Sequence, residues 1–267
     1  MARRTPDGPP PPPVVQRVRI RYAKRGRLRF ASHRDFARSF ERALRRAEVP
    51  MGYSAGFSPH PKISYVGGAA PTGVASEAEY VEIGLAREVD VEQLRARLNA
   101  ALPDGLDLLD AVLAGPGSLA ERITGTEWHI ELPGVPLDEA RRAVRLFLDQ
   151  VEVGVERMTK NGRRTVDVRA PIVRLSVADD TPGEAGAAPC AEGAARSGGS
   201  RAILTVVVRQ VIPTVRPDDV VAALAAVAGL APAAPPLAVR LAQGPLDDDG
   251  VIGDPLDADR MNATTAS

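Results

Sequence analysis

The alternation of apolar and polar positions changes period several times along the chain. Residues 14–25 alternate as a half-buried strand whose outer side is basic. Ser32 followed by Asp35 has the spacing of a capping box, which predicts a helix that continues to about Ala47. The same pattern predicts strands at 62–66, 79–85 and 106–113 and a helix at 91–101. This order of strand, helix, strand, strand, helix, strand is typical of the split βαβ unit.

The second half repeats the order with one strand in excess. It predicts strands at 127–132, 151–158, 165–177, 202–211 and 237–242 and helices at 137–150 and 217–230. Asn161-Gly162 is a strong hairpin signal between two of these strands. We therefore predict an α+β protein of two tandem ferredoxin-like (split βαβ) domains, at residues 14–116 and 125–243.

Three segments lack any periodic pattern and are predicted to be disordered. Residues 1–13 form an arm rich in proline and arginine, and residues 179–200 are a small, glycine-rich insertion within the second domain. Residues 244–267 carry six aspartates and one arginine, which indicates an acidic tail.

The formal net charge of zero conceals a strong asymmetry. The chain has 34 basic and 34 acidic side chains, but residues 1–65 hold 15 of the basic and only 4 of the acidic ones. The field near a surface follows the local charge, so this first quarter attracts anions although the whole chain is neutral.

Several classes of protein are excluded by motif and composition. No apolar run approaches the roughly 20 residues that a membrane helix requires, and no P-loop, dinucleotide fingerprint or zinc-protease motif is present. A single cysteine, Cys190, cannot by itself hold an iron–sulfur cluster. We expect a cytoplasmic protein that has no contact with a membrane, no metal site and no cofactor of its own.

The basic segment supplies the candidate contacts to RNA or phosphate. The planar guanidinium of arginine suits phosphate, and exposed tyrosines can stack on bases. The candidates are Arg19, Arg21, Lys24, Arg25, Arg27, Arg34, Arg38, Arg42, Tyr53, His60 and Lys62. The alternative is that the helix arginines are merely solvated and that the strand arginines pair across the sheet with Glu77, Glu79 or Glu82.

Three of the basic side chains are candidates for catalysis. His60 lies between two prolines and is therefore presented by a rigid loop, Lys62 follows it, and His33 begins the arginine-rich helix. Two neighbouring histidines could act as an acid and a base. The alternative is that both histidines have only structural hydrogen bonds.

Residues 28–82 contain a distinctive set of motifs: Ser32-His33 and Asp35, the helix end Arg42-Ala43-Leu44-Arg45-Arg46, Tyr53-Ser54, and Gly56-Phe57-Ser58-Pro59-His60-Pro61-Lys62. With these motifs the segment resembles a family of radical-SAM-linked proteins, and the resemblance extends less distinctly to about residue 240. Such domains are fused to, or encoded beside, radical S-adenosylmethionine enzymes that bind cobalamin. Arg34 and Phe36 depart from the usual pattern, in which aliphatic residues are commoner there.

The resemblance implies a separately encoded radical SAM enzyme as partner. That partner would carry the iron–sulfur cluster, S-adenosylmethionine and cobalamin, because this chain has no three-cysteine motif. We therefore expect a non-catalytic accessory protein whose basic first domain binds the RNA substrate, a tRNA or a ribosomal RNA.

Two alternatives of other classes stay open. A metal-independent endoribonuclease of the CRISPR repeat-processing type has the same tandem layout and a histidine at its first helix, but its glycine-rich loop near the C-terminus is not evident. A protein-interaction adaptor would instead use the arginines to meet an acidic partner.

Overall fold

The computed structural model describes residues 11–159, 162–178 and 200–265. Over these residues the chain is α+β, with a large mixed sheet, a two-stranded hairpin and six α-helices. It divides into one unit of residues 1–73, 78–120 and 256–267 and a second of residues 74–77 and 121–255. Within the described part of the chain, no helix combines the length and the apolar composition that crossing a membrane would require.

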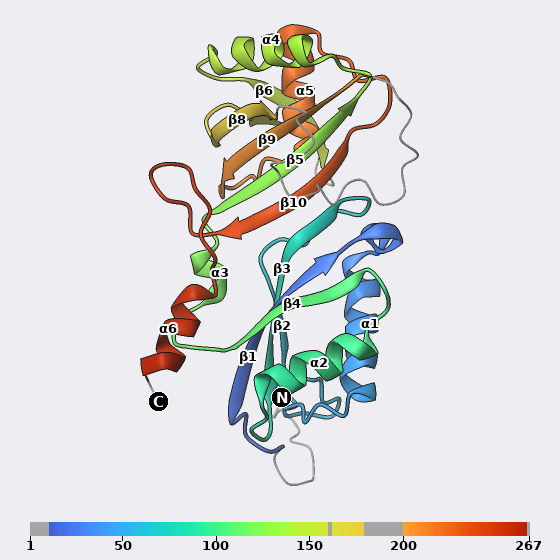
Figure 1. The fold of residues 1–267 in the computed structure, drawn as a ribbon, viewed down its shortest axis with the longest axis vertical. Coiled ribbons are helices and arrows are strands. Elements are labelled where there is room, and N and C mark those ends of the chain that lie inside the picture. The colour runs from blue at the N-terminus through green and yellow to red at the C-terminus, as the bar shows by residue number, and fades with distance from the viewer. Residues whose placement is uncertain (1–10, 160–161, 179–199, 266–267) are drawn as a thin grey trace, which may run out of the picture. The chain divides into compact units, whose positions relative to one another are not determined.

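The first unit is a four-stranded sheet with two helices on one face (Figure 1). Its elements are β1 (Gln16–Lys24), the 3-10 helix η1 (Gly26–Phe30), α1 (His33–Arg46), β2 (Ile63–Val66), β3 (Ala75–Leu85), α2 (Val91–Ala101) and β4 (Leu106–Leu113). The strand order is β4-β1-β3-β2, and both β1 with β4 and β2 with β3 are antiparallel.

Local sequence signals explain the elements of this unit. The predicted capping box is present, because the Ser32 hydroxyl accepts from the Asp35 backbone and the Asp35 carboxylate accepts from the Ser32 backbone. Phe36, Phe40 and Leu44 of α1 are buried against Ile20 of β1 and its neighbours, as the periodicity predicts. The predicted elements of this half are thus confirmed to within a few residues.

The second unit has a core of its own. Its elements are β5 (Gly125–Pro133), α4 (Leu137–Leu148), β6 (Gly154–Thr159), β7 (Gly162–Asp167), β8 (Ile172–Ala178), β9 (Arg201–Arg209), α5 (Pro217–Ala228) and β10 (Leu237–Gly244). The strand order is β10-β5-β9-β8, with every pair antiparallel. The start of β3 also pairs in parallel with β10, through Ala75 and Ser76. The short helix α3 (Leu119–Arg122) precedes β5.

The strand predicted at residues 165–177 is two strands. The Asp167 carboxylate accepts hydrogen bonds from the backbone N–H groups of Arg169 and Ala170, which turns the chain between β7 and β8. β7 then pairs with β6 as a separate hairpin, and β8 joins the main sheet. Asn161 of the predicted turn lies outside the described residues.

The predicted disordered tail at residues 244–267 is wrong over residues 244–265. Leu256 is fully buried, and α6 (Asp257–Thr265) follows it. The Asp259 carboxylate accepts a hydrogen bond from the backbone of Gly115 at 2.9 Å and pairs with Arg19 at 2.7 Å. These contacts order the segment. The arm at 1–10 and the insertion at 179–199 lie outside the described residues.

Arg19 of β1 forms a buried ion pair with Asp259 of α6. Its side chain is 4% exposed and also bonds to Glu82 of β3 at 2.9 Å. Burial opposes the charge, but the two carboxylates outweigh it and raise the pKa of the Arg19 guanidinium above its ordinary value. The arginine therefore stays charged in the interior.

Neutralising Asp259 should destabilise the protein. Asp259→Asn leaves the buried Arg19 with one carboxylate, so we expect the free energy of unfolding to fall by about 3 kcal/mol in urea denaturation. Asp257→Asn is the matched control, because Asp257 is 64% exposed and its pair with Arg260 should contribute under about 1 kcal/mol. Equal losses in the two variants would contradict the role given to Arg19.

Candidate functional site

Two of the predicted RNA-binding cations lie in the interior and cannot meet a ligand. Arg19 is enclosed by Glu82 and Asp259, and Lys24 is buried with its ammonium donating to the backbone oxygens of Ala70 and Pro71 at 3.1 and 3.3 Å. The prediction was wrong for both, because each side chain is buried and bonded within the protein. The alternative of pairing across the sheet is confirmed for Arg19.

Arg21 and Arg25, the predicted cations on either side of Lys24, also interact with other residues of the protein. Arg25 pairs with Asp107 at 3.0 Å, with each side chain about one-third exposed. Arg21 is half-buried and has an interaction partner. Arg27, on η1, is exposed.

The cations that remain accessible lie mainly on α1. Arg34, Arg38 and Arg42 are exposed and follow one another at intervals of four residues, which places them in one stripe along the helix. Hydrogen bonds from the Ser32 hydroxyl and backbone, together with Arg38 and Arg34 nearby, lower the pKa of the Asp35 carboxyl below its ordinary value. We call Arg34, Arg38 and Arg42 the α1 stripe.

The loop at residues 53–62 is held closed by its own backbone. The Ser54 N–H donates to the His60 carbonyl at 2.9 Å, and the His60 N–H donates to the Ser54 hydroxyl at 3.0 Å. Tyr53 and Pro61 also form an isolated antiparallel β-bridge. Because two prolines flank His60, the loop has few conformations to lose on binding a ligand.

A backbone triangle joins this loop to the end of β3. The N–H of Gly52 donates to Gly84, the N–H of Gly84 to Lys62, and the N–H of Lys62 to Gly52, all at 2.7–2.9 Å. A Cβ on Gly52 would come within 2.8 Å of a Val14 methyl and 3.2 Å of the Gly84 oxygen. Residue 52 must therefore be glycine, because Val14 and the backbone of Gly84 leave no room for a Cβ.

Two pockets adjoin on either side of His60. One, of about 340 Å³, includes Tyr53, Leu44, Val49, Met51 and Arg45 in its lining. The other, of about 350 Å³, includes Lys62, Arg17, Ser54, Ser64 and Glu82. The structure thus brings together Tyr53, His60 and Lys62 of the predicted site residues.

His33 lies apart from these pockets. It begins α1, whereas Leu44 and Arg45 line the pocket of Tyr53, eleven residues along the helix or roughly 17 Å at 1.5 Å per residue. The His33 ring instead packs edge-on against Tyr65, with centroids 4.6 Å apart. Burial raises the pKa of Tyr65 to about 12. His33 and His60 therefore do not form an acid–base pair.

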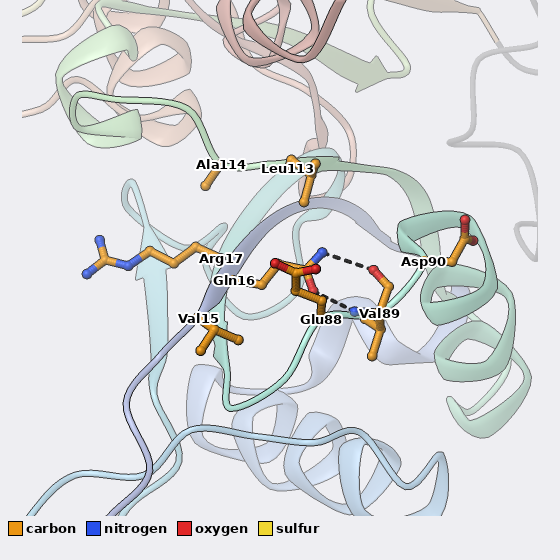
Figure 2. Close-up of a pocket in the computed structure, with 8 residues that line it drawn as sticks. All are labelled: Val15, Gln16, Arg17, Glu88, Val89, Asp90, Leu113 and Ala114. Carbon is orange, nitrogen blue, oxygen red and sulfur yellow. Dashed lines mark hydrogen bonds between the residues drawn. The ribbon is translucent and has the colours of Figure 1, made fainter. Parts of the chain in front are cut away.

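A third pocket, of about 700 Å³, lies beside β1. Figure 2 shows the Gln16 amide bonded to both backbone groups of Val89, while the Arg17 side chain extends away from the Glu88 carboxylate. Glu88 and Asp90 give this pocket two carboxylates against one cation. It is therefore unsuited to a phosphate.

Sequence reasoning did not select two accessible residues near His60. Phe57 is 72% exposed at the tip of the loop, and Arg17 reaches the pocket of Lys62. An aromatic residue within a run of glycine, serine and proline was the available signal for Phe57, because such a loop has no core in which to bury it. Arg17 had no signal that separated it from Arg19.

Among the residues that the structure describes, no three His, Cys, Asp or Glu side chains come together as ligands. The chemistry available around His60 is that of three cations, two carboxylates, an imidazole, hydroxyl groups and exposed aromatic rings.

A family model described as an uncharacterized protein conserved in bacteria (DUF2344) matches residues 17–217. The match includes both helices of the first unit and the whole loop at residues 53–62. The chain belongs to this family. No curated protein matches this DUF2344 member.

Among solved structures, the chain is similar to one in a crystal structure of a Cbf5-Nop10-Gar1 complex. The TM-score is 0.45 and the identity is 13%, over 93% of this chain. The alignment spans 57% of the length of that matched chain.

A methyl group at residue 52 should disturb the loop of this DUF2344 protein. Gly52→Ala brings its Cβ against Val14 and the backbone of Gly84, so we expect a loss of about 1–3 kcal/mol in the free energy of unfolding. Gly68→Ala is the control, because a Cβ there meets nothing within 4 Å. Urea denaturation of both variants checks this, and an undisturbed Gly52→Ala would refute the packing argument.

Proposed function

We propose that this protein binds RNA through the α1 stripe and the neighbouring loop at residues 53–62, as a non-catalytic accessory of a radical SAM enzyme. The observation that carries the proposal is the exposure of Arg34, Arg38 and Arg42 on a helix with five arginines and two carboxylates. Arginines in a row suit a row of phosphates, because each guanidinium offers a planar set of donors.

The stripe and the loop belong to one continuous region of the first unit. Glu41 and Arg45 of α1 line the same pocket as Tyr53 and His60. A nucleic acid strand that follows the α1 stripe toward the C-terminal end of the helix would therefore reach the loop. Exposed Tyr53 and Phe57 offer ring faces on which bases can stack.

We infer that each unit is ferredoxin-like. Both sheets have the order fourth, first, third, second strand when the β6–β7 hairpin is taken as an insertion. This order and the two helices per sheet support the split βαβ assignment. Many unrelated functions occur on this fold, so the assignment by itself carries no argument for RNA.

The radical SAM partner is proposed from the resemblance over residues 28–82 alone. In that role the partner supplies the radical chemistry and this chain presents the RNA. The separation of His33 from His60 gives no support to a two-histidine nuclease, and we do not propose one.

Removing the α1 stripe should weaken RNA binding in a salt-dependent way. We expect the triple variant Arg34→Ala, Arg38→Ala, Arg42→Ala to bind single-stranded RNA of about 12 nucleotides at least about tenfold more weakly. The slope of log affinity against log salt should fall by about 2, because each lost phosphate contact removes about 0.7 from the slope. Fluorescence anisotropy at several salt concentrations measures both quantities.

A matched control separates a site from a general effect of charge. Helix α4 carries Arg141, Arg142 and Arg145, which are also exposed, so their replacement by alanine removes the same charge elsewhere. Equal losses in the two triple variants, or wild-type affinity that does not depend on salt, would overturn the proposal. Binding to an acidic protein partner without affinity for RNA would favour the adaptor instead.

A further inference from the structure

The two pockets beside His60 differ in chemical character. The pocket of Tyr53 is lined by Leu44, Val49 and Met51 and also by the charged side chains of Glu41 and Arg45. The pocket of Lys62 has a second cation, Arg17, two serine hydroxyl groups and the Glu82 carboxylate. Each is at the small end of the range for ligand pockets, roughly 300–1,000 Å³. One cleft offers an exposed tyrosine ring and the other offers two neighbouring cations, and His60 lines both, so the pair matches the two ends of a nucleotide.

The cations of the second pocket are available to an anion. The Lys62 ammonium has no hydrogen bond or ion pair with any other residue that the structure describes, and the side chain is exposed. Arg17 is 67% exposed and lies 3.7 Å from Glu82. That carboxylate already bonds to Arg19 at 2.9 Å, so the contact with Arg17 is weak and a phosphate can replace it.

The pocket of Tyr53 has a face for a base. Tyr53 is 42% exposed at the mouth, which leaves part of its ring uncovered. The bridge from Tyr53 to Pro61 and the bonds between Ser54 and His60 fix the loop before any ligand arrives. A ring held in this way contributes stacking without a large entropic cost.

We propose that the paired pockets hold one unstacked nucleotide of a single-stranded RNA. The base lies against Tyr53 in its pocket, and Lys62 and Arg17 bind the phosphate. This inference rests on the proposed function and narrows it, because bases inside a duplex are stacked and paired and cannot enter the pocket. The substrate class is therefore an RNA loop, bulge or unpaired end.

The base contact is tested by comparing one RNA as a strand and as a duplex. We expect Tyr53→Ala to weaken binding of a strand of about 12 nucleotides by about tenfold and to leave the affinity for its duplex unchanged. Tyr53→Phe keeps the ring and should bind the strand as the wild type does. Circular dichroism spectra and melting temperatures establish that both variants are folded.

The phosphate contact is tested with Lys62→Ala. It should lower the slope of log affinity against log salt by about 0.7 for the single strand. Arg87→Ala is the matched control, because Arg87 is exposed in the same unit, lines neither pocket and carries the same charge. We expect its slope to equal that of the wild type.

The outcomes separate this inference from the function on which it rests. If Tyr53→Ala weakens binding of the single strand and of the duplex equally, or weakens binding of neither, the nucleotide pocket is overturned. The α1 stripe variant still tests RNA binding independently in that case. A loss in Tyr53→Phe as large as in Tyr53→Ala would also overturn stacking as the contact. If the wild type binds neither RNA, both the pocket and the proposed function fail.

Discussion

The first unit depends on keeping the guanidinium of Arg19 neutralised in its interior. A buried cation without counter-charges would cost several kcal/mol, so β3 contributes Glu82 and α6 contributes Asp259. This requirement accounts for two features at once. It removes a cation from the basic surface that the sequence suggests, and it gives a polar segment near the end of the chain a reason to be helical. The charge that a ligand can meet is consequently mainly on α1, on the loop at residues 53–62 and at Arg17 of β1.

Local signals were sufficient to predict most of the secondary structure. The Ser32–Asp35 capping box and the Asp90 cap of α2 act within four residues, and the alternation around Ile20 sets which side of β1 is buried. The contacts that order α6 could not be predicted in this way. Arg19 and Asp259 are 240 residues apart, and the residues next to each of them in the sequence do not indicate that the two form a pair. The sequence predicts β7 and β8 as one strand because the β-like residue pattern continues through the turn at Asp167.

The candidate site was predictable where its residues are close in sequence. Tyr53, His60 and Lys62 belong to one loop whose prolines restrict it, so their convergence follows from short-range constraints. His33 was grouped with them on chemistry alone, and the length of α1 separates it. Arg17 and Arg19 have the same identity and the same strand face. Only the packing of α6 over Arg19 makes one of them structural and leaves the other accessible.

The arrangement separates two kinds of interaction within one proposed RNA-binding surface. The α1 stripe acts through charge, which attracts any phosphate backbone and weakens as salt screens it. The Tyr53 pocket acts through stacking and burial, which depend little on salt but require an unpaired base. A duplex can satisfy only the first, and a single strand can satisfy both. Raising the salt concentration therefore removes the contribution that the two forms share and leaves the one that distinguishes them. In the proposed binding mode, selectivity for unpaired RNA comes from the rigid loop, which the glycines at residues 52 and 84 hold against β3.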